Sequence, residues 1–117
     1  MLARTYRFQG LGSVRAAMNH GDTTRAGLFT IKHLAQPRRE HPRIGIIVSK
    51  KTAKRATVRN RIRRRIYGLF KTHWHLITRP IDIVVIVHES KVAEMPASEL
   101  DDLFVKTLQK ALAGNLK

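Results

Sequence analysis

The chain has 117 residues, a length typical of a single domain with one hydrophobic core. It contains no cysteine, which excludes disulfides, cysteine-ligated zinc and thiol catalysis, and which favours a reducing compartment. Its longest apolar run, Ile83–Val87, is far too short to cross a bilayer, and residues 1–7 lack the apolar segment of a secretion signal. We therefore expect a single cytoplasmic domain over residues 1–117.

Charge is the strongest signal in the composition, and it is unevenly distributed. Twenty-three lysines and arginines against eight acids give a net charge of +15, yet residues 1–79 alone carry +17. Nine basic residues and no acid lie between Lys50 and Arg65. The like charges of such a segment repel one another in a compact fold. A polyanionic partner explains this charge better than a cationic surface that only keeps the protein soluble, because such surfaces usually intersperse both signs. Nucleic acid is favoured over a membrane, because the basic helix described below turns its apolar side toward a core.

The first half of the chain is expected to hold a short helix followed by strands. Residues 1–12 are expected to be irregular, and whether they are flexible is left open. A helix is predicted over Val14–His20, between a serine cap and a glycine stop. Alternating apolar residues predict strands over Leu28–Leu34 and Arg43–Ser49, joined by the polar segment Gln36–Pro42.

The second half is expected to hold two longer helices around one buried strand. A helix is predicted to start within Ala53–Val58 and to end near His73–Leu76. Ile81–His88 is apolar on both faces, which is typical of a central strand. An apolar stripe predicts a final helix over Ala97–Ala113. The order is helix, strand, strand, helix, strand, helix, with room for one more short strand, which makes the chain an α+β domain.

The helix rich in arginine is the candidate functional element. Its predicted apolar stripe consists of Val58, Ile62, Ile66 and Leu69. Flanking this stripe we expect Arg59 and Arg63 on one side and Arg61 and Arg65 on the other, with Asn60, Arg64, Tyr67 and Lys71 pointing away from the core. Because no acid lies on this helix, an external anion is needed to relieve the repulsion between stacked cations. Arginine binds phosphate oxygens bidentately and stacks on bases, which suits structured RNA.

Two sequence motifs place the chain beside a known family. Arg43–Lys51 reads Arg-Ile-Gly-Ile-Ile-Val-Ser-Lys-Lys, and Arg59–Arg61 reads Arg-Asn-Arg on the predicted helix. Together they closely resemble the protein subunit of bacterial ribonuclease P, and the resemblance covers about residues 7–113. It implies the order helix, three strands, helix, strand, helix, with a four-stranded sheet, helices packed on it and a left-handed strand–helix–strand crossover.

The resemblance also implies a function, partners and site residues. The protein would bind a catalytic RNA subunit and the 5′ leader of precursor tRNA. The RNA subunit would carry out the cleavage, and Mg²⁺ would be needed in the RNA-containing holoenzyme. No cofactor, metal site or catalytic residue is assigned to the protein. The expected RNA-binding residues are Lys50, Lys51, Lys54, Arg55, Arg59, Asn60, Arg61, Arg63, Arg64 and Arg65. The expected lining of the leader-binding cleft is Val14, Arg15, Met18, Arg25 and Lys32. Because Val14, Met18 and Lys32 replace aromatic residues common in the family, we expect leader binding to depend more on cations than on ring stacking.

Two alternatives remain open at this stage. The protein could itself be a metal-free ribonuclease that uses His73 and His75 with a lysine, although two histidines two residues apart should diverge on a helix. Histidines at a helix end are better explained by the dipole, and we expect the protein alone to cleave nothing. The second alternative is a ribosomal or general RNA-binding protein that has the same basic helix without a role in processing.

Overall fold

The computed structural model describes residues 18–19 and 21–114 of the chain. The strands are β1 (Asp22–Arg25), β2 (Phe29–Ala35), β3 (Arg43–Val48) and β4 (Ile81–Val87). The helices are α2 (Ala56–Thr72) and α3 (Ala97–Gly114), with the 3₁₀ helices η2 (Trp74–Leu76) and η3 (Ser90–Ala93). Most of the helix predicted over Val14–His20 lies outside the described residues, but Met18 and Asn19 are helical.

The strands form one four-stranded sheet in the order β1-β2-β4-β3, which confirms the α+β class. β1 is the additional short strand, and it pairs antiparallel with β2 through a tight turn in which Gly27 has a φ of 82°. A positive φ favours glycine because it has no Cβ. β4 lies antiparallel to β2 and parallel to β3, so α2 connects two parallel neighbours. The left-handed sense of this crossover stays a prediction.

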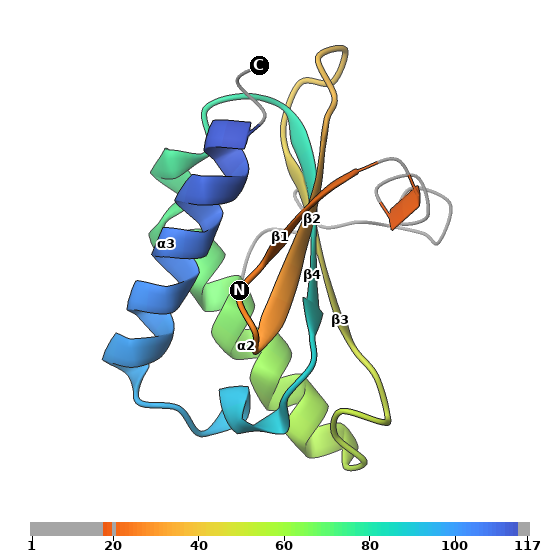
Figure 1. Cartoon of the computed structure of the whole chain (residues 1–117), viewed down its shortest axis with the longest axis vertical. Helices are drawn as coiled ribbons and strands as arrows, with labels where there is room; N and C mark the ends of the chain where they lie inside the picture. The colour runs from red at the N-terminus through yellow and green to blue at the C-terminus, as the bar shows by residue number, and fades with distance from the viewer. Residues whose placement is uncertain (1–17, 20, 115–117) are drawn as a thin grey trace.

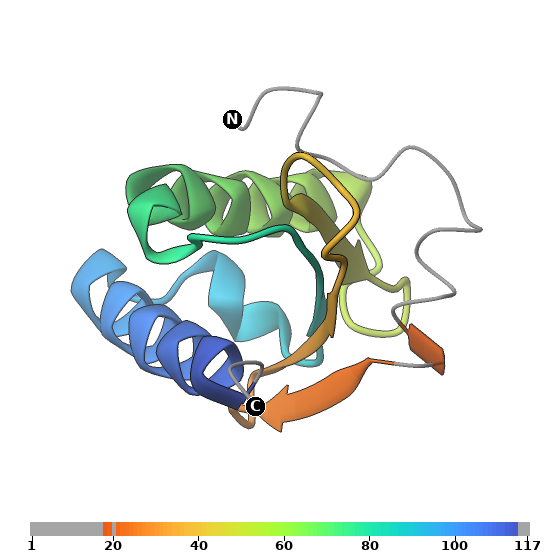
Figure 2. The ribbon, with the colours of Figure 1, turned by 90° about the horizontal axis from the view of Figure 1, so that it is seen from above.

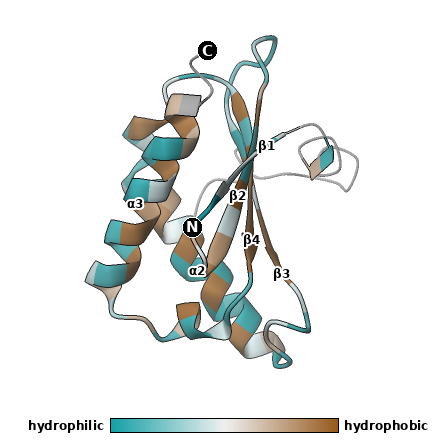
Figure 3. Cartoon of the chain, viewed as in Figure 1, coloured by the Kyte–Doolittle hydropathy of each residue, from teal (hydrophilic) through white to brown (hydrophobic). Residues whose placement is uncertain are grey.

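Both long helices cover the same face of the sheet (Figures 1 and 2). α3 packs on β1 and β2, whereas α2 packs on β3 and η3. Figure 3 shows that the sheet is largely hydrophobic along β3 and β4, whereas α2 and α3 carry both hydrophobic and hydrophilic residues. The rings of Phe70 from α2 and Phe104 from α3 meet edge to face, with centroids 4.9 Å apart. The strand side chains that face the helices include Phe29, Ile31, His33, Ile44, Ile46, Val48, Ile81, Ile83, Val85 and Val87.

The central position of β4 agrees with its sequence, because residues on both of its faces are buried. Ile83 faces the helices and Val84 faces the opposite side, and both are fully buried. The strand register places Thr23, Lys32, Val84 and Gly45 in one row across this second face. The alternation of a β-strand thus divides the sheet into a helix-covered face and a second face that carries polar and cationic side chains.

The predicted orientation of α2 needs one correction. Tyr67 was expected to point away from the core, but it is only 9% exposed and belongs to the core cluster. The most buried positions of the helix are Ile62, Ile66 and Phe70, so the buried arc is centred closer to Phe70 than the stripe through Leu69 predicts. Because η3 also packs against α2, a wider part of its circumference is covered than a single sheet contact would bury.

Candidate nucleic-acid interface

The loop between β3 and α2 holds four cations beside the start of the helix. The backbone N–H groups of Thr52 and Ala53 both donate to the Ser49 carbonyl, at 3.1 Å. The Thr52 hydroxyl donates to the Val87 carbonyl at 3.1 Å, which fixes the loop to the end of β4. Because the loop turns so tightly, Lys50 and Lys51 lie at its exposed surface. Lys54 and Arg55 follow directly before the helix.

The exposed cations of this loop and of residues 56–64 of α2 form one surface, which we call the basic surface. Its members are Lys50, Lys51, Lys54, Arg55, Arg61 and Arg64, all of them exposed. Within the described part of the chain, the two ion pairs are Arg43–Asp82 and His73–Asp101, and neither involves a residue of the basic surface. The positive charge of this surface is therefore not neutralised by the carboxylates of the described chain, and an external polyanion can neutralise it.

The start of α2 adds to the positive potential of the basic surface. Its first turn contains no acid, and its N-cap residue Arg55 makes no side-chain cap hydrogen bond. The free N–H groups and the dipole at such a terminus attract anions. A cavity of about 430 Å³ lies beside this terminus; the charged residues of its lining are the four cations Lys54, Arg55, Arg61 and Lys91 and one acid, Glu94.

Two arginines of the predicted set instead hold the fold around the basic surface. Arg59 donates from Nη1 to the carbonyls of Ala53 and Lys54, at 2.9 and 2.8 Å. Arg65 donates from Nη1 to the Val92 carbonyl at 2.7 Å and from Nη2 to the Met95 carbonyl at 2.6 Å. Arg59 thereby closes the β3–α2 loop, and Arg65 joins α2 to the segment around η3.

The remaining two predicted RNA-binding residues lie next to each other on α2. Arg63 is half-buried and donates from Nη1 to the Asn60 side-chain oxygen at 3.2 Å, while Asn60 is exposed. This bond uses one of the donors of the guanidinium group, and its other donors remain on the same side of the helix as Asn60. Both residues therefore lie at the margin of the basic surface.

The structure brings together only part of the expected leader-binding cleft. Arg25 and Lys32 lie on the sheet face opposite to α2 and α3, because their strand partners are Thr30 and Thr23. Arg25 is exposed and Lys32 is half-buried. Val14 and Arg15 lie outside the described residues, and Met18 is half-buried. The prediction that these five residues share one cleft thus stays a prediction.

The two histidines considered for catalysis are closer together than the sequence suggests. α2 ends at Thr72 and a 3₁₀ turn follows, so His73 and His75 do not diverge as they would on a continuous α-helix. Their ring centroids are 6.2 Å apart. His73 Nε2 lies 2.6 Å from the Asp101 carboxylate and so connects the end of α2 to the first part of α3. This contact gives His73 a structural partner.

Two further features bear on metal and membrane binding. Among the described residues, no group of three or more histidine or acidic side chains is arranged to hold a metal ion. None of the described helices combines the length and apolar character needed to span a bilayer.

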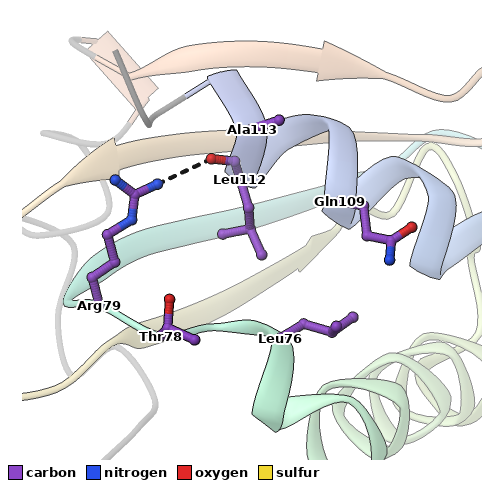
Figure 4. Close-up of a pocket in the computed structure, with 6 residues that line it drawn as sticks. All are labelled: Leu76, Thr78, Arg79, Gln109, Leu112 and Ala113. Atoms are coloured by element: carbon purple, nitrogen blue, oxygen red, sulfur yellow. Dashed lines mark hydrogen bonds between the residues drawn. The ribbon is translucent and has the colours of Figure 1, made fainter.

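A second cavity, of about 240 Å³, lies at the far end of α2 and α3 (Figure 4). Its lining residues are Leu76, Thr78, Arg79, Gln109, Leu112 and Ala113. Arg79 donates from Nη2 to the Leu112 carbonyl at 3.0 Å, so this cation interacts with the last turn of α3. A cation at that position satisfies a terminal carbonyl and complements the helix dipole.

Comparison with known proteins gives this surface a context. The family model for ribonuclease P matches residues 2–112. The chain belongs to the ribonuclease P protein family. The ribonuclease P protein component of Idiomarina loihiensis is 48% identical over 63 residues, which is 54% of this chain and 50% of that protein. The chain thus matches about half the length of this curated relative.

Solved structures of ribonuclease P proteins share the fold. The protein from Staphylococcus aureus has a TM-score of 0.79 at 27% identity, covering 91% of this chain and 94% of that one. A mutant of the Staphylococcus aureus protein, described as defective in mRNA degradation activity, has a TM-score of 0.81 at 27% identity, covering 92% and 89%. The protein from Thermotoga maritima has a TM-score of 0.74 at 20% identity, covering 83% and 89%, and shows likeness in fold.

Sequence reasoning missed the side chains that position the site. The hydrogen bonds of Arg59 and Arg65 to backbone carbonyls have no sequence signal, because the sequence does not distinguish one arginine of a basic run from another. The pairing of the buried Asp82 carboxylate with Arg43, at 3.0 Å, did have a sequence signal. A lone acid in an otherwise apolar central strand requires a buried partner, since an unpaired charge there would be costly.

Proposed function

We propose that this protein is the RNA-binding subunit of a ribonuclease P ribonucleoprotein that removes the 5′ leader from precursor tRNA. The observation that carries the proposal is the basic surface itself, which has six exposed cations without carboxylate partners in the described chain. Its position on the Arg-Asn-Arg helix of a ribonuclease P protein supports RNA as the polyanion.

In this proposal the basic surface binds the folded catalytic RNA. Arg61 and Arg64 lie three residues apart on α2, so their guanidinium groups are neighbours that can contact adjacent phosphates. Arg59 and Arg65 keep the loop and the helix in place, which lowers the entropy lost when the surface binds. Arg25 and Lys32, on the other sheet face, would contact the single-stranded leader.

The chemistry of cleavage belongs to the RNA in this proposal. The basic surface repels divalent cations, so the Mg²⁺ ions of the holoenzyme would be held by phosphates of the RNA. The protein would contribute by neutralising phosphates and by holding the substrate. A role in tRNA maturation would place the protein in the cytoplasm, where precursor tRNA is made.

The first experiment identifies the RNA that binds. The tagged full chain is purified from its native host at low salt, and the bound RNA is sequenced. The proposal expects enrichment of a structured RNA of the ribonuclease P type. Enrichment of ribosomal RNA instead would support the rival hypothesis of a general RNA-binding protein and contradict the proposal.

The second experiment tests the basic surface with matched variants. Arg61→Ala and Arg64→Ala should each weaken binding to the catalytic RNA by roughly tenfold, the equivalent of about 1.4 kcal/mol for one phosphate contact. Lys106→Ala and Lys110→Ala remove equally exposed cations from α3 and should leave binding unchanged. If all four variants bind alike, the basic surface is not the RNA interface.

The third experiment asks whether the protein alone cleaves RNA. Cleavage of precursor tRNA should require both subunits and leave a 5′-phosphate on the mature tRNA. A histidine-based ribonuclease would instead give 2′,3′-cyclic phosphate ends without the RNA subunit. Such products, lost in His73→Ala or His75→Ala, would assign cleavage to the protein. An mRNA substrate belongs in the assay, because the Staphylococcus aureus mutant is described as defective in mRNA degradation activity.

A further inference from the structure

The loop between β2 and β3 presents a second pair of exposed arginines, far from the basic surface. It crosses the start of β4, because β4 lies between the two strands that the loop connects. Figure 1 shows this loop at the opposite end of the sheet from the β3–α2 loop. The six residues of β3 separate the two loops by roughly 20 Å. Arg38 and Arg39 are exposed in it.

A buried carboxylate holds both ends of this loop. Asp82, the second residue of β4, is fully buried and accepts a hydrogen bond from Gln36 Nε2 at 3.0 Å. It also accepts from Arg43 Nε at 3.1 Å and from Arg43 Nη2 at 3.0 Å. Gln36 is the first residue after β2, and Arg43 is the first residue of β3. One carboxylate thus ties the beginning and the end of the loop to the strand between them.

The loop is also restrained from within. The Arg39 N–H donates to the Gln36 carbonyl at 3.0 Å, which forms a turn with Pro37 at its second position. Proline fixes φ at that position, and Pro42 restrains the other end of the loop. The Gln36 N–H donates to the Pro80 carbonyl at 3.1 Å. Arg38 and Arg39 are therefore carried by a turn that loses little conformational entropy when it binds a partner.

The Arg43–Asp82 pair is better explained by positioning than by stability. Burying two charges costs several kcal/mol of desolvation, and apolar side chains at such sites are often as stable or more stable. What apolar residues cannot supply is the directional contact of one carboxylate with two separate chain segments. The pair therefore fixes where the exposed arginines stand relative to the sheet.

We propose that Arg38 and Arg39 form a second phosphate-binding site, which contacts the same folded RNA as the basic surface. The inference rests on the proposed function and extends it to a footprint with two separated contacts. Within residues 21–114 neither arginine forms an ion pair, and the one acid of the loop, Glu40, leaves its exposed tip positive. Two neighbouring guanidinium groups suit the phosphodiester backbone, which carries one charge per nucleotide.

Binding measurements at several salt concentrations test this site. The double variant Arg38→Ala/Arg39→Ala should bind the catalytic RNA roughly tenfold more weakly, and its salt slope should fall by about 1 to 2. The double variant Lys106→Ala/Lys110→Ala, with the same loss of charge on α3, should match the unaltered protein in both values. If the two double variants behave alike, the second site is refuted.

The absence of cysteine allows an independent test with a tethered cleavage reagent. A hydroxyl-radical probe is attached to Glu40→Cys in the β2–β3 loop, which keeps both arginines of the site, to Thr57→Cys on α2, or to Gln109→Cys on α3. The inference expects the first two probes to cut the catalytic RNA at different nucleotides, and the third to cut it at neither site. RNA cut only from Thr57→Cys would overturn the second site and leave the proposed function intact. Failure of the unaltered protein to bind the RNA would overturn the proposed function itself.

Discussion

The adjacent residues Arg64 and Arg65 allow a sharp test of how α2 divides its arginines between folding and binding. Arg65 is half-buried, and its guanidinium group donates to the carbonyls of Val92 and Met95, at 2.7 and 2.6 Å. Arg64 is exposed and belongs to the basic surface. We predict that Arg65→Ala destabilises the fold, whereas Arg64→Ala weakens RNA binding without destabilising it.

The expected loss of stability follows from the two hydrogen bonds. A hydrogen bond to a charged group contributes about 1.5–3 kcal/mol, so two of them would give at least about 3 kcal/mol. Because Arg65 is only half-buried, water can replace part of this interaction, and we expect a loss of about 2 kcal/mol in the free energy of unfolding. For a domain of this size, that corresponds to a fall of roughly 8 °C in melting temperature.

Thermal and urea denaturation, followed by circular dichroism, measure the stability of both variants. RNA binding is then measured at a temperature at which both variants are folded. Arg64→Ala should keep its melting temperature and lower the salt slope of RNA binding by about 1, since it removes one phosphate contact. Arg65→Ala should keep the slope. Equal melting temperatures for the two variants, or a lower slope in Arg65→Ala, would refute this division of roles.

Four other predictions concern the anion site, the core and the contact between α2 and α3. If the six cations of the basic surface each neutralise one phosphate, RNA affinity should fall by roughly 10³-fold between 50 and 200 mM salt, and a nearly flat dependence would contradict phosphate binding. Inorganic phosphate or sulfate should raise the melting temperature of the free protein by binding the folded form, and an unchanged value would count against an anion site. Ile62→Asp should abolish the cooperative unfolding transition, because it places an unpaired charge at a fully buried position; a folded variant would show that α2 is packed differently. Asp101→Ala should lower stability by up to about 1 kcal/mol through loss of the 2.6 Å contact with His73, while the exposed Asp102→Ala serves as the control, and equal effects would contradict a role for that contact.

The surroundings of each arginine on α2 explain why some are available to bind RNA and others stabilise the fold. Arg61 and Arg64 are exposed on α2, whereas the guanidinium group of Arg65 bonds to the carbonyls of Val92 and Met95 at and beyond η3. Arg59 lies one turn into the helix, where the loop carbonyls of Ala53 and Lys54 are within reach. Carbonyl oxygens of loops and 3₁₀ turns are acceptors that need donors when they are partly buried. The same residue type thus has two roles, according to what lies next to it.

Local patterns in the sequence predicted most of the elements. The alternation in β2 and β3, the apolar run of β4 and the apolar stripe of α3 each place side chains on a face that must be buried, and a period of two or 3.6 residues is enough to identify that face. The concentration of cations between Lys50 and Arg65 likewise requires no tertiary information. The sequence by itself therefore determined the element types, the central strand and the segment that carries the positive charge.

Only the tertiary structure decided how those side chains are used. Tyr67 is buried, Arg65 bonds to two carbonyls around η3, and His73 meets Asp101, because elements distant in the chain pack beside α2. Asp82 joins two segments that are separated from it by about 40 residues of sequence. Such contacts depend on which surfaces come together when the helices cover the sheet. Helical periodicity describes one element at a time and contains no information about its neighbours.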